Sequence, residues 1–178
     1  NIASLGAVEV INPFATFAGR LALAIHTPGL HILFEWLTGV PHERLHEPLF
    51  PPHGTWILCG YGRFGKAVHQ RLTAEGIKVQ VIESDIAQAK PPPDAVAGLG
   101  TDAKTLHQAG VEHAVGIVAG TDSDANNLSI IITARALNPE LFTVARQNQR
   151  INSDLFNTAK LDLVMQRGSV IAHKIFAL

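Results

Sequence analysis

From Thr55 onward, short apolar runs alternate with longer segments whose apolar residues recur at helical spacing. The first run, residues 55–60, predicts a strand. Phe64, Val68 and Leu72 then recur every four residues and predict a helix over residues 63–75. Further runs predict five more strands, over 79–82, 95–99, 114–120, 141–146 and 161–165. Between and after them we expect helices over 102–110, 122–137, 151–159 and from residue 169 onward.

Six strands separated by crossovers of this length pair in parallel. We therefore expect an α/β fold, a Rossmann-like doubly wound parallel sheet of six strands. Residues 1–53 are less regular, rich in Pro and His, and end in a Pro-Pro pair before Gly54. This composition predicts a mostly helical N-terminal extension or linker over residues 1–53, followed by the Rossmann-like domain over residues 54–178.

The most apolar stretch, residues 21–37, is broken by Pro28-Gly29 and contains Glu35 and two histidines. It predicts a helix, a break and a second helix, because a membrane-spanning helix needs roughly 20 mostly apolar residues. Core packing is the favoured role, and a partner surface is the alternative. Residues 7–24 also align weakly with residues 161–178, each as a strand followed by a helix. Either the chain begins in the tail of a preceding similar domain, or any two strand-helix pairs would look this similar.

Composition narrows the function classes. The formal net charge of −1 provides no long-range field for gathering nucleic acid or anionic lipid, so we expect no nucleic-acid partner. A single cysteine, Cys59, excludes a disulfide within the chain and suits a reducing compartment. Cys59 ends an apolar strand, which predicts a buried small hydrophobic residue rather than a redox group. No basic region followed by an apolar run indicates a signal peptide.

The strongest motif is G-x-G-x-x-G, formed by Gly60, Gly62 and Gly65 between the first strand and its helix. Such glycines permit a tight turn, let the backbone approach a pyrophosphate, and let the helix pack closely on the sheet. Glu83 ends the second strand 18 residues after Gly65, where a carboxylate can accept hydrogen bonds from a ribose. Arg63 could pair with phosphate. The context predicts NAD or an adenine nucleotide rather than NADP, the alternative being a Rossmann-like fold whose site is unused.

Two separated motifs resemble the RCK or KTN (TrkA-N type) regulatory domain of potassium channels and transporters. The first runs from the glycine turn through "KVQVIESD", and the second is "GTDSDANNL", residues 120–128. The similarity covers residues 55–178. It implies a cytosolic domain, at the inner face of the membrane, that forms a homodimer or higher oligomer and binds NAD(H), AMP, ADP or ATP. It also implies a membrane pore domain, in the same chain or in a partner subunit, whose ion flux the ligand controls.

The resemblance assigns no catalytic residue and no metal ligand, and it implies roles for particular residues of a nucleotide site. The phosphates would be held by the turn and Arg146, the ribose by Glu83 and Asp85, and the base or phosphates by Thr101 and Thr121. The complete expected set is Gly60, Tyr61, Gly62, Arg63, Phe64, Gly65, Glu83, Ser84, Asp85, Thr101, Thr121, Asp122 and Arg146. One departure is Leu99, where the family usually has an acid after glycine, and this makes the identity of the nucleotide less certain. In "GTDSDANN", Asp122 or Thr121 could equally serve only as a helix cap.

"HERLH", residues 42–46, matches the H-E-x-x-H zinc motif. The flanking prolines leave fewer than two helical turns, so a solvated linker is the favoured interpretation. Other histidines, including His69, His107, His113 and His173, show no ligand spacing and are expected at the surface.

Three function classes remain. A regulatory binding domain is favoured, because a ligand that binds two conformations unequally shifts their populations. The alternative is an NAD-dependent oxidoreductase, which needs a substrate pocket beside the nicotinamide. After six strands we expect no sequence for a substrate domain, so we do not expect an enzyme. A dimerisation domain without a ligand is the third class.

Overall fold

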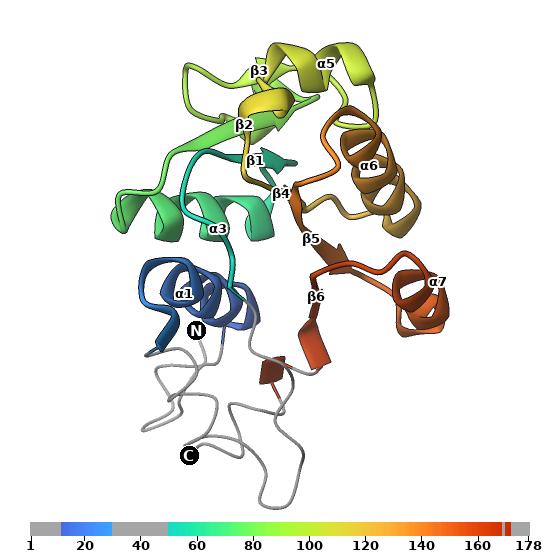
Figure 1. Ribbon diagram of the computed structural model, residues 1–178. Coiled ribbons are helices and arrows are strands. Elements are labelled where there is room, and N and C mark those ends of the chain that lie inside the picture. Colours follow the sequence, from blue (N-terminus) through green and yellow to red (C-terminus); the bar gives the residue numbers. More distant parts are fainter. Residues whose placement is uncertain (1–11, 30–49, 169, 172–178) are drawn as a thin grey trace, which may run out of the picture.

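The computed structural model describes residues 12–29, 50–168 and 170–171. Its sheet confirms the predicted fold, because six strands pair in parallel in the order β3-β2-β1-β4-β5-β6 (Figure 1). The strands are β1 (Trp56–Cys59), β2 (Val79–Glu83), β3 (Val96–Ala97), β4 (Gly116–Ala119), β5 (Phe142–Gln147) and β6 (Leu163–Gln166). The α-helices include α1 (Pro13–His26), α3 (Arg63–Ala74), α4 (Ile86–Ala89), α5 (Ala103–Gln108), α6 (Asp124–Leu137) and α7 (Ser153–Thr158), and 3-10 turns include η2 (Val111–His113) and η3 (Arg150–Asn152). Residues 28–29, 167–168 and 170–171 are helical as well, so the last predicted helix begins two residues earlier than expected.

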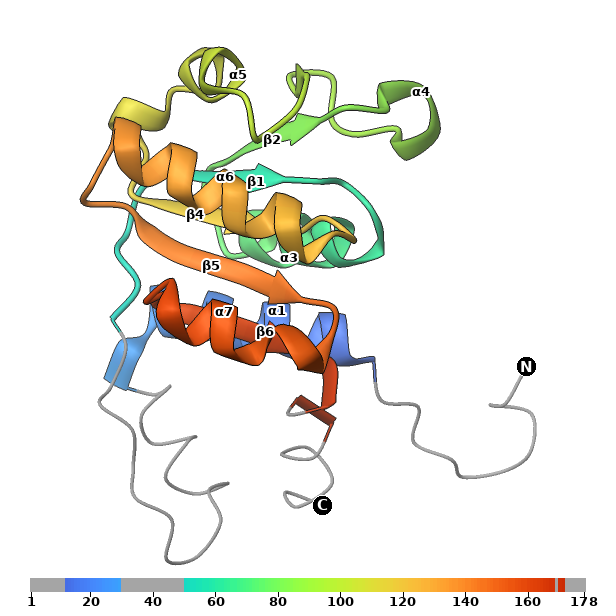
Figure 2. The same cartoon turned by 90° about the vertical axis from the view of Figure 1, so that its right-hand side faces the viewer.

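The strand order reverses between β1 and β4, and this reversal distributes the helices. Right-handed crossovers place the helix between β1 and β2 on one face and those that follow β3, β4 and β5 on the other. Figures 1 and 2 show α3 on one side of the sheet and α6 and α7 on the opposite side. Open α/β sheets bind their ligands at the carboxyl ends of the strands where the order reverses, which here are the ends of β1 and β4.

Alternate residues of the central strand face the two helical layers. Trp56 and Leu58 belong to a cluster with α3, whereas Ile57 and Cys59 belong to a second cluster with α5, α6 and α7. All four side chains are buried, so β1 reads as a continuous apolar run rather than an alternating one. A parallel sheet covered on both faces requires this pattern.

Helix α1 completes the layer on the α3 side. Asn12 caps its first turn by accepting from the backbone N–H of Phe14, and Pro13 occupies the first helical position. Its side chains Phe17, Leu21 and Ile25 are buried and share the first cluster with residues of β4, β5 and β6, namely Val118, Val144 and Met165. None of the described crossover helices after β4 or β5 lies on this face, so α1 supplies apolar cover that the topology does not. The predicted core-packing role of the apolar stretch 21–37 is confirmed for residues 21–26, which lie in α1. The domain boundary at residue 53 stays a prediction.

Local differences from the predicted elements have simple causes. Helix α6 begins at Asp124 and its cap is Ser123, so the expectation that Asp122 or Thr121 caps it is wrong. The Ser123 side chain accepts from the N–H of Asn126 instead. β3 shrinks to two residues, because only Ile82 and Glu83 pair with it. α4 is a short turn capped by Asp85.

Several sequence interpretations fall on residues outside the described ranges. They are the H-E-x-x-H segment at 42–46, most of the second helix after Pro28-Gly29, the strand of the weak repeat at the start of the chain, and His173. They stay predictions. Within the described ranges, no helix is long and apolar enough to cross a membrane.

Cys59 confirms its predicted place as a buried small residue, with 1% of its surface exposed. A Cβ added to Gly100 would lie 2.8 Å from the Cys59 sulfur, so the loop before α5 packs directly on the thiol. Burial raises the pKa of Cys59 to about 12. The group is therefore a neutral thiol at physiological pH.

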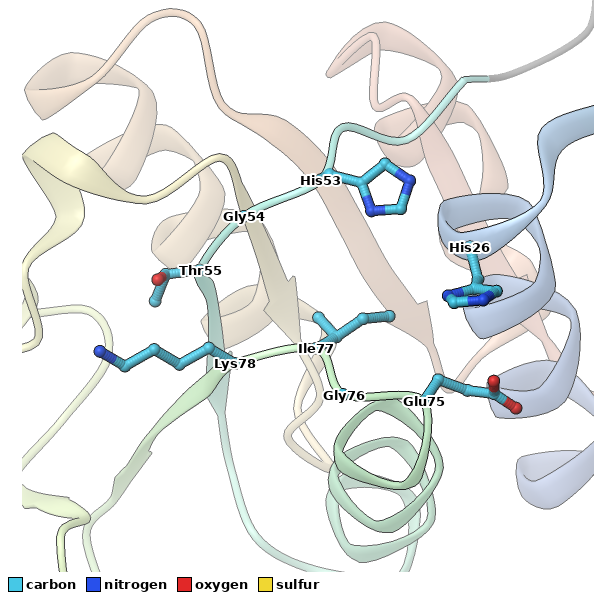
Figure 3. Close-up of a pocket in the computed structure, with 8 residues that line it drawn as sticks. All are labelled: His26, His53, Gly54, Thr55, Glu75, Gly76, Ile77 and Lys78. Atoms are coloured by element: carbon cyan, nitrogen blue, oxygen red, sulfur yellow. The ribbon is translucent and has the colours of Figure 1, made fainter.

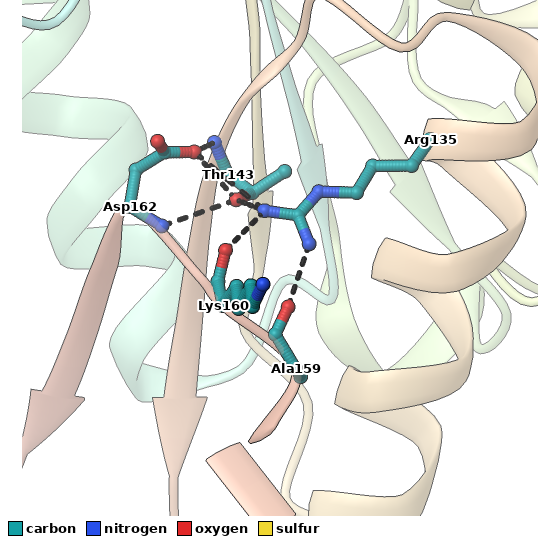
Figure 4. A network of polar contacts seen from close by, with 5 residues as sticks. All are labelled: Arg135, Thr143, Ala159, Lys160 and Asp162. Carbon is teal, nitrogen blue, oxygen red and sulfur yellow. Dashed lines mark hydrogen bonds and ion pairs between the residues drawn. The ribbon is translucent and has the colours of Figure 1, made fainter. Parts of the chain in front are cut away.

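Arg135, near the end of α6, joins three elements at the amino ends of β5 and β6 (Figure 4). Its guanidinium donates to the carbonyls of Ala159 and Lys160 at 2.7 and 2.6 Å, and to the Thr143 hydroxyl at 2.8 Å. The carboxylate of Asp162 accepts from the backbone N–H and the hydroxyl of Thr143. The group satisfies carbonyls that the end of α7 would otherwise leave unpaired.

Replacement of Arg135 by alanine should lower the free energy of unfolding by about 1–3 kcal/mol, because three hydrogen bonds from one cation are lost. Urea unfolding of Arg135→Ala against wild type measures the change. Arg150→Ala is the matched control, because Arg150 is exposed and its side chain forms no ion pair with the described residues; it should change stability by less than about 0.5 kcal/mol. Equal losses in the two variants would contradict the structural role of Arg135.

Candidate functional site

The turn between β1 and α3 has the geometry that its glycines predict. Gly60 has a φ of 95°, a left-handed conformation that favours glycine. A Cβ on Gly65 would lie 2.0 Å from the Gly60 carbonyl oxygen, so only glycine lets α3 approach the strand this closely. Gly62 caps α3 without a side chain, and no heavy atom lies within 4 Å of the position its Cβ would take. The first N–H groups of a 12-residue helix therefore face open space beside an exposed backbone.

Glu83 fastens this turn to the neighbouring strand. One oxygen of its carboxylate accepts from the Tyr61 N–H at 2.6 Å, and the other accepts from the Asp85 N–H at 2.8 Å. The Ser84 hydroxyl donates to that second oxygen at 3.2 Å. A carboxylate has about four lone-pair positions and three are occupied, so the oxygen that accepts from Tyr61 can still accept one hydrogen bond from a ribose. Glu83 therefore has a structural role in the folded chain. Its expected contact with a ribose stays a prediction.

Thr121 and Arg146 reach the same edge of the sheet because Asn127 holds them together. Asn127 is fully buried; its oxygen accepts from the N–H and hydroxyl of Thr121, and its nitrogen donates to the carbonyls of Thr121 and Arg146. A Cβ on Gly60 would meet Thr121 at 3.3 Å, so Thr121 adjoins the glycine turn. Asn127 belongs to the motif "GTDSDANNL", but the sequence alone predicts no role for it. A buried amide has to be hydrogen-bonded, and that requirement is the signal that could have identified it.

The Arg146 side chain lies beside the turn and forms no hydrogen bond or ion pair with the described residues. Its guanidinium carbon lies 5.1 Å from the ring centre of Phe14 and 6.0 Å from that of Phe64. Nε is buried and donates to no hydrogen-bond acceptor among the described residues. Burial lowers the pKa of Arg146, as do the nearby cations Arg167 and Arg63, whereas Asp122 and Asp124 act against this change. A cation held on aromatic rings at the glycine turn favours an anionic ligand.

Asp124 organises the loop behind the site. Its carboxylate accepts from the N–H groups of Asn148 and Gln149 and from the side-chain amides of Asn148 and Asn152, at 2.6–3.0 Å. Burial alone would raise the pKa of Asp124, but these hydrogen bonds outweigh it and lower the pKa. The carboxylate links the start of α6 to the chain after β5, which is a structural role rather than a ligand contact.

The remaining expected site residues are less closely gathered. Asp85 caps α4 by accepting from the N–H of Gln88, which occupies part of its carboxylate. Thr101 lies in the loop before α5, where its carbonyl accepts from the Thr133 hydroxyl at 3.4 Å. Asp122 is exposed near Arg146, and Leu99 is 59% exposed. The structure therefore brings together the glycine turn, Glu83, Thr121 and Arg146, while the ligand roles of all thirteen residues stay predictions.

The histidines add detail. His107 and His113 are exposed as expected. His69 is half-buried beside Tyr61, with its Nδ1 3.4 Å from the Tyr61 hydroxyl, so it is less exposed than the other two. Burial lowers the pKa of His69, and Asp94 opposes this. Within the described ranges, no three side chains of His, Cys, Asp or Glu gather at one point as metal ligands.

A hollow of about 480 Å³ lies at the other end of the strands from the glycine turn. It is open and is lined by His26, His53 and Lys78 among others (Figure 3). Lys78 directly precedes β2, so this hollow is at the amino ends of the strands. Parallel sheets of this kind bind ligands at their carboxyl ends, which favours the glycine turn as the site.

Replacement of Gly65 by alanine should reduce the free energy of unfolding by about 3 kcal/mol or more, because the added methyl group meets backbone at 2.0 Å. Gly62→Ala is the matched control in the same turn. Its φ of −72° suits alanine and its Cβ meets nothing, so its stability should stay within about 1 kcal/mol of wild type. Denaturant unfolding compares the two, and a destabilised Gly62→Ala with an intact Gly65→Ala would contradict the packing.

Asp124→Asn should destabilise the chain by about 1–3 kcal/mol at neutral pH, because one amide oxygen cannot replace a carboxylate that accepts four hydrogen bonds. The pKa of Asp124 is lower in the folded chain than its ordinary value of 3.8. Its contribution is therefore complete above that value and is lost as the pH falls through the folded pKa. Unfolding measured from about pH 7 to about pH 2 should show the deficit of the variant shrinking at the acid end. A constant deficit would show that the charge of Asp124 does not stabilise the fold.

Comparisons with known proteins show what the chain is similar to. The chain is 30% identical over 113 residues to potassium channel protein 1 of Methanocaldococcus jannaschii, covering 60% of this chain and 34% of that protein. It is 31% identical over 130 residues to the Trk system potassium uptake protein TrkA homolog of Pyrococcus abyssi, covering 67% of this chain and 57% of the relative. The chain thus spans less than two thirds of the length of these curated relatives.

Solved structures show the same fold. The GsuK channel bound to NAD is 26% identical, with a TM-score of 0.61 over 81% of this chain and 24% of that chain. The crystal structure of GsuK bound to ADP covers 98% of this chain and 40% of that chain, with a TM-score of 0.68, and at 23% identity it shows the fold alone. The family model of the TrkA-N domain matches residues 56–167. That match covers more than half of the 178 residues, and it includes the glycine turn and all six strands, so the chain belongs to the TrkA-N family.

Proposed function

We propose that this chain binds NAD(H) or an adenine nucleotide at the turn between β1 and α3 and so regulates the ion flux of a potassium channel or transporter. The observation that carries the proposal is the juxtaposition of two anion-binding features at one edge of the sheet. The uncapped first turn of α3 offers backbone N–H groups above Gly62, and Arg146 lies beside it with a buried Nε that lacks a partner among the described residues. A pyrophosphate fits both.

The position of Glu83 supports a nucleoside beyond the pyrophosphate. Glu83 ends β2, the strand next to β1, and its carboxylate is fixed by the Tyr61 and Asp85 N–H groups. An acid fixed at this place can accept from a ribose, and it disfavours a 2′-phosphate by charge. NAD or an adenine nucleotide is therefore favoured over NADP.

The relatives support the regulatory role. They are a potassium channel protein and a potassium uptake protein, and the similar channel GsuK was solved with NAD. We propose by analogy that this chain lies at the inner face of the membrane, works as a homodimer or higher oligomer, and acts on a pore in the same polypeptide or in a partner. Binding of the nucleotide would act by favouring one of two conformations.

An NAD-dependent oxidoreductase is the alternative. It would need an acid or hydride-positioning group beside the nicotinamide, whereas the relatives are a potassium channel protein and a potassium uptake protein. We therefore propose binding without catalysis. Oxidation of bound NADH by any of a panel of carbonyl substrates, followed by absorbance, would favour the alternative.

The proposal predicts that the thermal unfolding temperature of the chain rises with NAD, NADH, AMP, ADP or ATP, since a ligand that binds only the native state stabilises it. Gly62→Ala should keep wild-type stability without ligand and lose about tenfold or more in nucleotide affinity, because its methyl group fills the space above the turn. Gly19→Ala is the matched control on α1, where an added Cβ also meets nothing. If no nucleotide shifts the transition of wild type, the chain is a domain without a nucleotide ligand.

A further inference from the structure

We propose that Arg167 is a third phosphate-binding residue of this site and that it gives a nucleotide with a free di- or triphosphate end, such as ADP or ATP, an advantage over NAD. Arg167 directly follows β6 and lies outside every motif of the sequence. The inference rests on the proposed nucleotide site and deepens it, because it selects among the nucleotides that the glycine turn admits.

The sheet register brings Arg167 to the same edge as Arg146. Arg146 on β5 is paired with Met165 on β6, and Arg167 lies two residues beyond Met165 toward the carboxyl end. Val144 and Met165 both face α1 and α3, as the first hydrophobic cluster shows. The period of two along a strand places Arg146 on this face as well.

The side chain of Arg146, which belongs to β5, lies close to the start of α3. Its guanidinium is 6.0 Å from the ring of Phe64, which is the residue after Arg63. Three arginines from three separate elements, the start of α3, the end of β5 and the residue after β6, therefore converge on the glycine turn. Of the cations that depress the pKa of Arg146, Arg167 acts more strongly than Arg63.

The three guanidinium groups have no anionic partner in the described part of the chain. Neither Arg63 nor Arg146 nor Arg167 forms an ion pair there, and Arg63 and Arg167 are exposed. The nearest carboxylates are Asp122, which is exposed, and Asp124, whose oxygens accept four hydrogen bonds from amides. Like charges that gather without compensation destabilise the free protein and are relieved when an anion binds between them.

The number of charges distinguishes the candidate ligands. The pyrophosphate of NAD is esterified at both ends and carries one charge per phosphate, which α3 and Arg146 can match. The terminal phosphate of ADP or ATP carries about −1.5 to −2 charges near neutral pH and has three acceptor oxygens, as phosphate monoesters do. Arginine is suited to such a group, because its planar guanidinium donates two parallel hydrogen bonds.

Isothermal titration of the chain with ADP, ATP, AMP and NAD tests the inference in wild type and Arg167→Gln. We expect Arg167→Gln to lower the affinity for ADP and ATP by about tenfold or more. The affinity for AMP, whose single phosphate lies at the glycine turn in the proposed site, and for NAD, which has no terminal phosphate, should fall by no more than about twofold. Lys78→Gln removes one positive charge at the amino ends of the strands and is the control. It should lower the affinity for none of the four nucleotides by more than about twofold. Without ligand, Arg167→Gln should unfold at the wild-type temperature or above it, since it relieves repulsion.

The outcomes separate this inference from the proposed function. If wild type binds nucleotides and Arg167→Gln weakens all four equally, or none, Arg167 does not select a terminal phosphate and the inference is overturned while the proposed function stands. If wild type binds no nucleotide, the proposed function fails. Binding of inorganic tripolyphosphate then tests whether the arginine cluster by itself binds a polyphosphate. Binding of tripolyphosphate that Arg167→Gln loses supports the cluster, and absence of binding overturns it.

Discussion

The structure depends on one requirement, which is that a parallel sheet has to be covered by apolar side chains on both faces. β1 satisfies it from both sides, with Trp56 and Leu58 toward one helical layer and Ile57 and Cys59 toward the other. Because the strand order reverses at β1 and β4, the crossover helices divide unequally between the faces. Helix α1, which precedes the sheet in the chain, fills the remaining area, and it carries Phe14 to the ring contact with Arg146. The layer of α1 thus both covers the core and contacts the candidate site.

The same reversal determines where the chemistry lies. At the carboxyl ends of β1 and β4, the close approach of Gly65 to the Gly60 carbonyl sets the start of α3 against the strand. Asn127 then ties the end of β4 to the end of β5 through Thr121 and Arg146. These buried polar contacts are fully paired, which makes the edge rigid without any ligand. What the edge leaves unpaired is positive, and this asymmetry between satisfied amides and unsatisfied guanidinium groups is what favours an anionic ligand at the proposed site.

Much of this could be predicted from the sequence, since the period of apolar residues specifies strands and helices wherever burial is one-sided or continuous. The six strands, the parallel sheet and the glycine turn follow from residues close to one another in the chain. Ser123 as the cap of α6, and Asp124 as an acceptor for four amides, do not follow, because several neighbouring side chains in "TDSDANN" could cap a helix and only the loop after β5 decides among them. Arg167 is harder still, since nothing in its local sequence indicates a site and only the register of β5 against β6 brings it near Arg146.

The burial of Cys59 has a practical consequence. Thiol reagents attack the thiolate, and with a pKa of about 12 the folded chain holds almost none of it, whereas an exposed thiol has an ordinary value of 9.0. The only cysteine of the chain is therefore silent in the native state and becomes reactive when the sheet opens. A spectroscopic label can be attached at a new surface cysteine with the natural one left in place, and the rate at which Cys59 itself reacts reports how often the centre of the sheet opens.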